Sequence, residues 1–462
     1  MDIKSGLEKY NEIIEREGVK FLDIKVANLS GQLKHFTIPA SKLDKKLFKE
    51  GIGADGSSVG GYATVESSDL RLVPDIDTGF LDPFFPQKTL SFLCNVTYAA
   101  KDGPFPLCPR QTAIRATGAL KELGIADESY WIPELEFFIF DGYTFDTDPM
   151  RISAQFYSCE STDKENFGYK FHKEGGYGAV PPFDKGLDIR TELTDLIEKI
   201  GIDIKVSHHE CGVPGQHEFE LDFKPLLRSC DEVILAKYFI RNIAARYNKV
   251  ATFMPKPLYR IAGSGMHVHQ LLKKNGKNIF SGNKYVNFSE TGLYYIGGIL
   301  EHIDAITGLA NPSTNSYKRL VPGYEAPTAV CYSPSNRTSA IRIPGYIRDP
   351  EVMRFEYRPA DATCNPYFML SSLVCAGIEG VLKKTDPGAP AEGNIEARKD
   401  IKKLPQSLGA ALEALEKGHE FLTSRGVFSK EAVERWVEVK SRESALVSEC
   451  PNPAEIDLYF NC

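Results

Sequence analysis

The sequence has no C-x-x-C pair among its ten cysteines, no long basic run and no apolar segment of membrane-spanning length. Without paired cysteines, neither a zinc ribbon nor a thiol redox motif is indicated. Because the net charge is -7 and Lys and Arg are scattered, no tract could neutralise a phosphate backbone, and nucleic acid is not expected as a partner. The most apolar stretch, Tyr367 to Leu382, carries Glu379 and falls short of the roughly 20 residues that a bilayer requires, so no membrane partner is expected.

Export signals and the common phosphate-binding loops are missing as well. Residues 1–18 are charged throughout and lack the apolar core of a secretory signal, so a reducing cytoplasm is predicted. No G-x-x-x-x-G-K-[ST] and no kinase motif is present, and the G-S-G of GSGMHVHQ lacks the third glycine of a dinucleotide fingerprint. Any phosphate that this chain binds must therefore be held by metals and arginines.

The 462 residues that are present predict an α+β protein of two domains. Residues 19–39 favour two short strands joined around Asn28 to Gln32, and residues 88–98 favour a third. Lys101 to Pro109 contains three prolines and one glycine, which is typical of a boundary, and we place the domain break near residue 105, giving domains 1–105 and 106–462.

Several helices are expected in the second domain. One covers Arg110 to Leu123, and the tail from Leu408 to Leu446 is mostly helical. Ser229 to Glu232 fits a capping box before an apolar run, which predicts that another helix begins at Ser229.

Two carboxylates share one face of a predicted strand. In WIPELEFFIF the aromatic and β-branched neighbours favour a strand, in which Glu134 and Glu136 point to the same side. An isolated E-x-E is usually a pair of solvated charges. Here the flanking residues are apolar, and two like charges beside them repel unless a cation lies between them.

Further donor groups follow along the chain. SHHECGVPGQHEFELDF folds Glu210 back towards Glu218 if its glycines and proline form a turn, although chance clustering in an exposed hairpin stays open. In GSGMHVHQ, His267 and His269 share a face if the segment is extended. In RFEYRPAD, Glu356 lies between two arginines, which is equally consistent with a structural ion-pair ladder.

Together these motifs form a donor set dominated by oxygen, which suits Mg²⁺ or Mn²⁺ better than zinc. The members are Glu134, Glu136, Glu210, Glu218, Glu356 and His267. Six donors exceed what one magnesium ion usually takes from protein, so we expect two or more ions with phosphates between them. Guanidinium groups that can hold phosphate oxygens follow at Arg319, Arg337, Arg342, Arg354 and Arg358.

These motifs resemble the glutamine synthetases of the bacterial and archaeal type I group over nearly the whole chain. The resemblance is carried by NPSTNSYKRLVPGYEAP at 311–327, SNRTSAIRIP at 335–344, GADGSSVGG at 53–61, GSGMHVHQ and CNPYF at 364–368. It implies a small N-terminal β-grasp-like domain, followed by a large catalytic domain with a curved antiparallel sheet surrounded by helices. It also implies ATP as a substrate, which phosphorylates glutamate before ammonia displaces the phosphate.

The resemblance implies roles for individual residues. Glu136, Glu210 and Glu218 are expected to bind one metal ion and Glu134, His267 and Glu356 a second, with two or three ions of Mg²⁺ or Mn²⁺ in each site. Arg337 and Arg342 would stabilise the transferring phosphoryl group, while Phe223, His269, Arg342 and Arg354 would contact the nucleotide. Gly263, Arg319 and Arg358 would hold glutamate, and Asp55 would deprotonate ammonium beside Ser58, Tyr177, Glu210 and Glu325. Glu325 would also lie on a flap over the site, and Asp55 would act across an interface in a dodecamer of two hexameric rings.

The chain departs from the family pattern at three places. Ala262 replaces an asparagine, Leu271 stands where a serine is common, and Pro359 to Thr363 alters R-x-P-D-P. Thr64 stands where feedback-sensitive members of the family carry an arginine, and no tyrosine corresponds to the one that is adenylylated in some bacterial members. We therefore expect neither this feedback inhibition nor adenylylation to operate in its familiar form. Two alternatives stay open: a γ-glutamyl ligase for an organic amine, and a non-catalytic oligomer that retains the fold.

Overall fold

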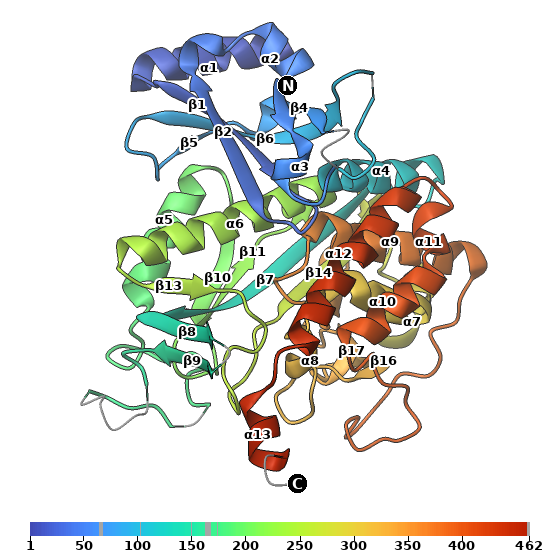
Figure 1. Cartoon of the computed structure of the whole chain (residues 1–462). Helices are drawn as coiled ribbons and strands as arrows, with labels where there is room; N and C mark the ends of the chain where they lie inside the picture. Colours follow the sequence, from blue (N-terminus) through green and yellow to red (C-terminus); the bar gives the residue numbers. More distant parts are fainter. Residues whose placement is uncertain (64–67, 102, 149, 162–167, 173, 460–462) are drawn as a thin grey trace.

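The computed structural model describes residues 1–459 except 64–67, 102, 149, 162–167 and 173 (Figure 1). Thr64, which bears on the prediction about feedback control, lies outside the described residues. Among the described residues no helix is both long enough and apolar enough to cross a bilayer.

The N-terminal part of the chain forms a sheet of six strands among the described residues, with helices beside it. The elements are α1 (Ile3–Glu17), β1 (Phe21–Ala27), β2 (Leu33–Pro39), α2 (Lys45–Glu50), β3 (Ile52–Asp55), α3 (Gly56–Val59), β4 (Asp69–Pro74), β5 (Phe80–Asp82) and β6 (Thr89–Tyr98). The strand order is β2-β1-β6-β4-β3, with β5 beside β6, and β1 pairs with β6 in parallel. The two strands predicted around Asn28 to Gln32 are confirmed as the antiparallel pair β1–β2.

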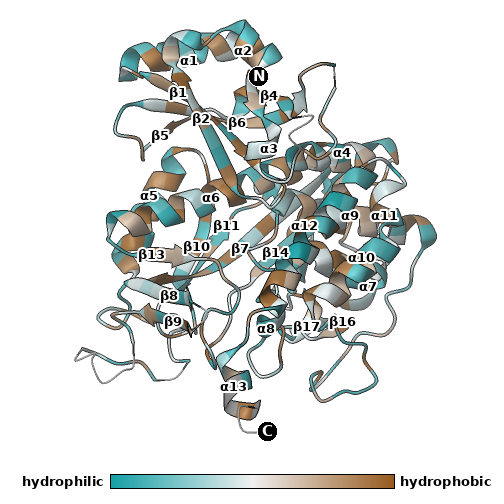
Figure 2. Ribbon diagram, viewed as in Figure 1, coloured by the Kyte–Doolittle hydropathy of each residue, from teal (hydrophilic) through white to brown (hydrophobic). Residues whose placement is uncertain are grey.

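Helix α1 illustrates how local sequence determines these elements. The Asp2 side chain accepts hydrogen bonds from the first-turn amides, and Gly18 ends the helix in the left-handed conformation at φ 68°. In Figure 2 hydrophobic and hydrophilic residues alternate along α1, as in an amphipathic helix. The buried Tyr10 packs edge-to-face on Phe92 of β6, with ring centroids 5.0 Å apart.

The rest of the chain forms a curved sheet of ten strands in the described part. The strands of this domain, including the separate hairpin β8–β9, are β7 (Glu128–Phe140), β8 (Gly142–Asp148), β9 (Arg151–Tyr157), β10 (Ile204–His209), β11 (Gln216–Leu221), β12 (Lys224–Pro225), β13 (Val250–Thr252), β14 (Met266–Lys274), β15 (Lys277–Asn278), β16 (Ala329–Pro334), β17 (Ser339–Ile343) and β18 (Phe355–Tyr357). The order is β10-β11-β7-β14-β18-β17-β16. The expectation of an antiparallel sheet is right for every pair except β16–β17, which is parallel, so the sheet is mixed.

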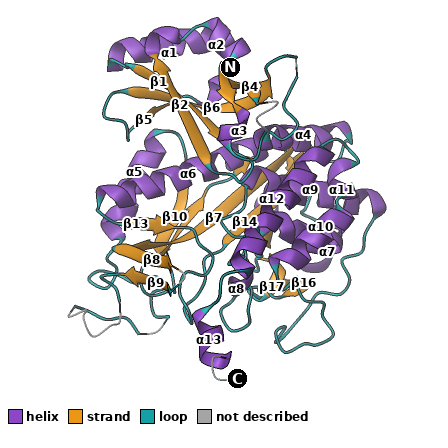
Figure 3. Ribbon diagram, viewed as in Figure 1, coloured by secondary structure: helices purple, strands orange, loops and turns teal. Residues whose placement is uncertain are grey.

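Helices surround this sheet (Figure 3). They are α4 (Pro109–Glu122), α5 (Leu187–Lys199), α6 (Leu226–Arg246), α7 (Glu290–Ala310), α8 (Ser316–Arg319), α9 (Pro366–Lys383), α10 (Leu408–Gly418), α11 (Glu420–Thr423), α12 (Lys430–Ser448) and α13 (Pro453–Tyr459). Helix α6 packs on β7, and α9 packs against α4, α6 and α7. The predicted break near residue 105 lies in the connection between β6 and α4, and the predicted helices at 110–123 and 408–446 are confirmed by α4, α10 and α12.

The prediction that a helix begins at Ser229 is wrong. Helix α6 begins at Leu226 after Pro225, whose fixed φ suits the start of a helix. Ser229 and Glu232 therefore lie inside α6, and Glu232 accepts a hydrogen bond from Arg228 at 2.7 Å rather than capping the backbone. Burial of the apolar side of this first turn, including Leu226, outweighs the local capping signal.

Candidate functional site

A cavity of about 610 Å³ opens on the face of the large sheet, over β7, β11 and β14. It brings together most of the residues that the sequence singled out. The predicted site residues that line it are Glu134, Glu136, Tyr177, Glu210, Glu218, Gly263, His267, Arg319, Glu325, Arg337, Arg342 and Arg358. Ala262, one of the departures from the family pattern, lies on the same wall.

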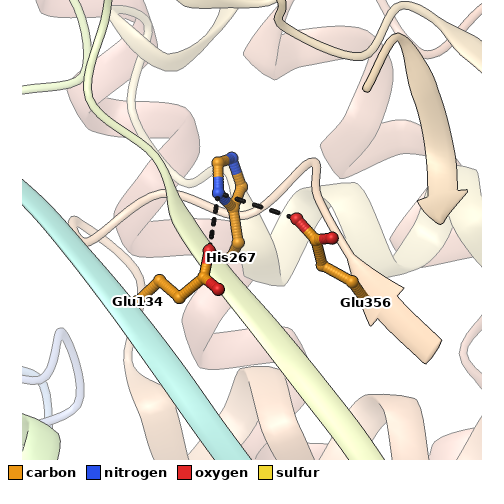
Figure 4. A group of neighbouring side chains, drawn as sticks. All are labelled: Glu134, His267 and Glu356. Carbon is orange, nitrogen blue, oxygen red and sulfur yellow. Dashed lines mark hydrogen bonds and ion pairs between the residues drawn. The ribbon is translucent and has the colours of Figure 1, made fainter. Parts of the chain in front are cut away.

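A first donor group comes from three adjacent strands (Figure 4). Glu134 on β7 lies opposite His267 on β14, and Glu356 comes from β18. The His267 Nδ1 atom is 3.3 Å from a Glu134 oxygen and 3.9 Å from a Glu356 oxygen. Strand alternation and the register of the three strands bring these donors to one place.

The electrostatics of this group favour ionised carboxylates. Burial opposes the ionisation of Glu134, but His269 and His267 hold the pKa of this carboxyl well below its usual range. Burial also opposes the ionisation of Glu356, yet the charges of Arg358, His269 and His267 together lower the pKa of Glu356 to about 2. The group therefore presents negative oxygens and one imidazole nitrogen, which fit a hard divalent cation such as Mg²⁺ or Mn²⁺.

A second donor group lies at the turn between β10 and β11. His208, Glu210 and Glu218 each place a donor atom within 4.8 Å of the others, and His208 Nε2 is 3.3 Å from a Glu218 oxygen. Burial raises the pKa of Glu218 well above its usual range, and the negative charges of Glu134, Glu136 and Glu210 raise it further. Together these effects outweigh the hydrogen bond from His208, which lowers the pKa. The Glu218 hydrogen bond raises the pKa of His208 to about 9. A divalent cation would relieve this crowding of carboxylates.

The composition of the second group differs from the expected ligand set. Glu136 lies opposite Glu218 across β7 and β11, but its carboxylate accepts hydrogen bonds from the Gly265 amide at 2.8 Å and from Gln216 at 3.4 Å. His208, and not Glu136, is the third member of this group of donor atoms. The sequence contained a signal for His208, because a hairpin that brings Glu210 towards Glu218 also pairs His208 with Glu218.

A third donor group contains a residue that sequence reasoning placed on the face of Glu218 but left out of the donor set. Glu220 on β11, opposite Glu134, joins Glu134 and His269 in a set of donor atoms within 4.8 Å. His269 is fully buried, and its Nε2 atom is 2.8 Å from Glu134 Oε1. The Lys205 ammonium contacts Glu220.

Arginines line the cavity beside the donor groups. Arg342 and Arg358 both contact the buried carboxylate of Glu356, and Arg358 also donates to the backbone oxygens of Arg337 and Glu325. Three of the five N–H donors of Arg358 are thus engaged, and two remain for a ligand. The buried Arg319 donates to Pro359 O at 2.8 Å, within the altered 359–363 segment.

Three of the predicted nucleotide contacts, Phe223, His269 and Arg354, are not among the residues that line the cavity. The Arg354 guanidinium lies over the Phe223 ring, 5.4 Å from its centroid, in a cation–π contact. Leu271, the third departure, is buried on β14. Glu325, the predicted flap residue, adopts a left-handed backbone conformation with φ 55°, which is costly for residues other than glycine.

Asp55 and Ser58 do not line the cavity. They lie in the N-terminal domain at β3 and α3, and Asp55 borders a separate hollow with Arg71. Hydrogen bonds from Ser58 and Ser57 lower the pKa of Asp55 to about 2, which keeps this exposed carboxylate ionised. Within one chain, the described residues therefore assemble the predicted metal and phosphate groups without the predicted base.

Comparison with known proteins adds to this geometry. The family model described as "Glutamine synthetase, beta-Grasp domain" matches residues 18–99, and the model described as "Glutamine synthetase, catalytic domain" matches residues 106–459. The glutamine synthetase of Azotobacter vinelandii is 40% identical, and the match covers 98% of this chain and 100% of the relative. The 3-hydroxylaminophenol mutase of Cupriavidus pinatubonensis is also 40% identical, with 97% and 98% covered. Among solved structures, Plasmodium falciparum glutamine synthetase superposes with a TM-score of 0.90 at 26% identity, covering 98% of each chain.

Proposed function

The chain belongs to the glutamine synthetase family of ATP-dependent ligases, and from this premise we propose that it joins ammonia to the γ-carboxylate of L-glutamate. ATP would phosphorylate glutamate to γ-glutamyl phosphate, and ammonia would then displace phosphate to give glutamine. The observation that carries the proposal is the convergence of carboxylate–histidine groups and guanidinium groups on one cavity. Such a site suits phosphoryl transfer, in which positioning and charge stabilisation dominate.

The donor groups would hold the divalent ions. Glu134, His267 and Glu356 would bind one ion, and Glu136, Glu210 and Glu218 a second, with His208 beside them. Bound there, Mg²⁺ or Mn²⁺ would neutralise phosphate charge and orient the γ-phosphoryl group.

Arginines would bind the anionic parts of the substrates. Arg337 and Arg342 would stabilise charge on the transferring phosphoryl group, while Arg319 and the free donors of Arg358 would bind the carboxylates of glutamate beside Gly263. The nucleotide would lie towards Phe223 and Arg354, with the His269 ring holding Glu134 in place.

Ammonium would be bound by anionic and polar groups. Glu210, Glu325 and Tyr177 line the cavity, and the ionised Asp55 would take the proton beside Ser58. Since Asp55 lies away from the cavity of its own chain, we propose that a neighbouring subunit supplies it, in a cytoplasmic dodecamer of two hexameric rings. Chemical cross-linking and mass measurement of the purified protein would test this assembly.

An organic amine is the second candidate acceptor. Two departures from the family pattern lie near the proposed glutamate-binding arginines, Arg319 and Arg358. Ala262 lies on the cavity wall, and the Pro359 carbonyl of the altered segment accepts a hydrogen bond from Arg319. Turnover with methylamine, ethanolamine or putrescine in preference to ammonium would support this alternative over glutamine synthesis.

The experiment that tests the proposal is phosphate release from ATP with Mg²⁺ and glutamate, with and without ammonium, alongside direct detection of glutamine. We expect release that depends on ammonium and equals the glutamine formed. Glu134→Gln should abolish both signals, whereas Glu128→Gln should not. Glu128 lies on the same strand but bonds Tyr130 outside the cavity, which makes it a matched control. Phosphate release without any ammonium dependence would contradict the proposal.

A further inference from the structure

Lys205 reaches the candidate site through an irregularity in the hairpin β10–β11. Ile204 pairs with Leu221 and Val206 pairs with Glu220, so Lys205 is one extra residue with no partner of its own. Such a β-bulge interrupts the alternation of side chains and re-aims one of them. Here Val206 is the residue paired with Glu220, yet it is the Lys205 ammonium that contacts the Glu220 carboxylate.

The carboxylate that Lys205 contacts belongs to the third donor group. Glu220 is only 8% exposed and lies opposite Glu134, which His269 contacts at 2.8 Å. Two carboxylates and an imidazole within 4.8 Å have the chemistry of a divalent-cation site. Two buried carboxylates side by side repel each other unless a cation lies near them.

We propose that Lys205 is a permanent cation of the third donor group, so that the site binds two divalent ions and no third. The ammonium is a compact point charge on a flexible stem, and it occupies Glu220, the oxygen donor that a third ion would need. The inference rests on the proposed function, because it concerns the metal content of the same site. The third group differs from the other two in that its carboxylate contacts a lysine. The carboxylates of the first group contact imidazole and guanidinium groups, and Glu218 of the second group contacts the His208 imidazole.

The test is Mn²⁺ binding by equilibrium dialysis of the full chain without nucleotide, with free Mn²⁺ followed by electron paramagnetic resonance. We expect two ions per chain for the unaltered protein and three for Lys205→Met, which frees Glu220. Lys205→Arg, which keeps the charge, should bind two. Adding Glu220→Gln to Lys205→Met should return the count from three to two. Lys249→Met is the control, because Lys249 forms a partly buried pair with Asp141 outside the cavity.

Each outcome bears on the inference. The Lys205 side chain is 36% exposed, so its variants should fold, and circular dichroism with a thermal melt checks this. Three ions in the unaltered protein, or two in a folded Lys205→Met variant, would overturn the inference while ammonium-dependent glutamine formation could still stand. No bound Mn²⁺ in the unaltered protein would overturn the proposed metal sites and this inference together.

Discussion

Replacing Arg110 tests the buried charge network that joins the two parts of the chain. Arg110 is 3% exposed and donates to Asp231 at 2.8 and 3.0 Å. It also contacts Asp75, from the N-terminal domain, at 2.8 Å, while the Tyr367 hydroxyl donates to Asp231 at 2.6 Å. Arg110→Met would leave the Asp231 carboxylate buried without a cation.

The expected cost follows from that burial. Removing one partner of a buried ion pair typically lowers the free energy of unfolding by about 3–5 kcal/mol, and we expect this range from urea unfolding of Arg110→Met. Adding Asp231→Asn should recover at least about half of the loss, because the neutral amide no longer needs a cation and still accepts from Tyr367. Arg16→Met is the control, since the Arg16–Glu17 pair has a similar separation of 2.9 Å but lies at the surface, and it should cost below about 1 kcal/mol.

Two results would refute this reasoning. Equal losses for Arg110→Met and Arg16→Met would show that burial does not set the cost. An additive double variant, in which Asp231→Asn recovers nothing, would show that the unpaired carboxylate is not its source.

Four further predictions concern the site and the core. Arg190 outweighs burial and lowers the pKa of Asp184, so Asp184→Asn should lower the unfolding free energy at neutral pH. The difference in unfolding free energy between the two proteins should vanish as the pH falls through the pKa of Asp184 in the folded state, because a carboxyl whose pKa is lowered by folding stabilises the fold only while it is ionised. Urea midpoints that stay equally separated between pH 7 and pH 3 would contradict this. Glu136→Gln should reduce the Mn²⁺-induced rise in melting temperature by the share of one ion, about 2.7 kcal/mol at 100 times its Kd, and an unchanged rise would remove Glu136 from the ligands. Asp55→Asn should slow glutamine formation at least about 100-fold while leaving that Mn²⁺ effect intact, so equal turnover would argue against a base. Trp436→Ala, which deletes a buried indole that donates to Gly308 O, should cost about 3–5 kcal/mol in urea, and a loss below about 1 kcal/mol would contradict its core role.

Many features of the site could be predicted because they depend on short spacings. Glu134 and Glu136 share a face through strand alternation alone, and so do His267 and His269. The turn that brings Glu210 to Glu218 is encoded by nearby glycines and a proline. In each case the relevant atoms are a few residues apart, so the local backbone conformation places them.

Other features depend on contacts that no short spacing encodes. The parallel pairing of β16 and β17 and the start of α6 at Leu226 depend on packing against elements far along the chain. The separation of Asp55 from the cavity follows from how the N-terminal sheet sits on the catalytic domain.

The sequence by itself determined the donor types, the alternation that points them to one face of a strand and the motifs of the glutamine synthetase family. Only the tertiary structure decided which strands lie side by side, and therefore that Glu356 meets His267 and that Glu220 joins Glu134. It also decided that a bulge turns Lys205 towards Glu220. The physical reason is that register between strands is set by the packing of the whole sheet, which a local pattern does not contain.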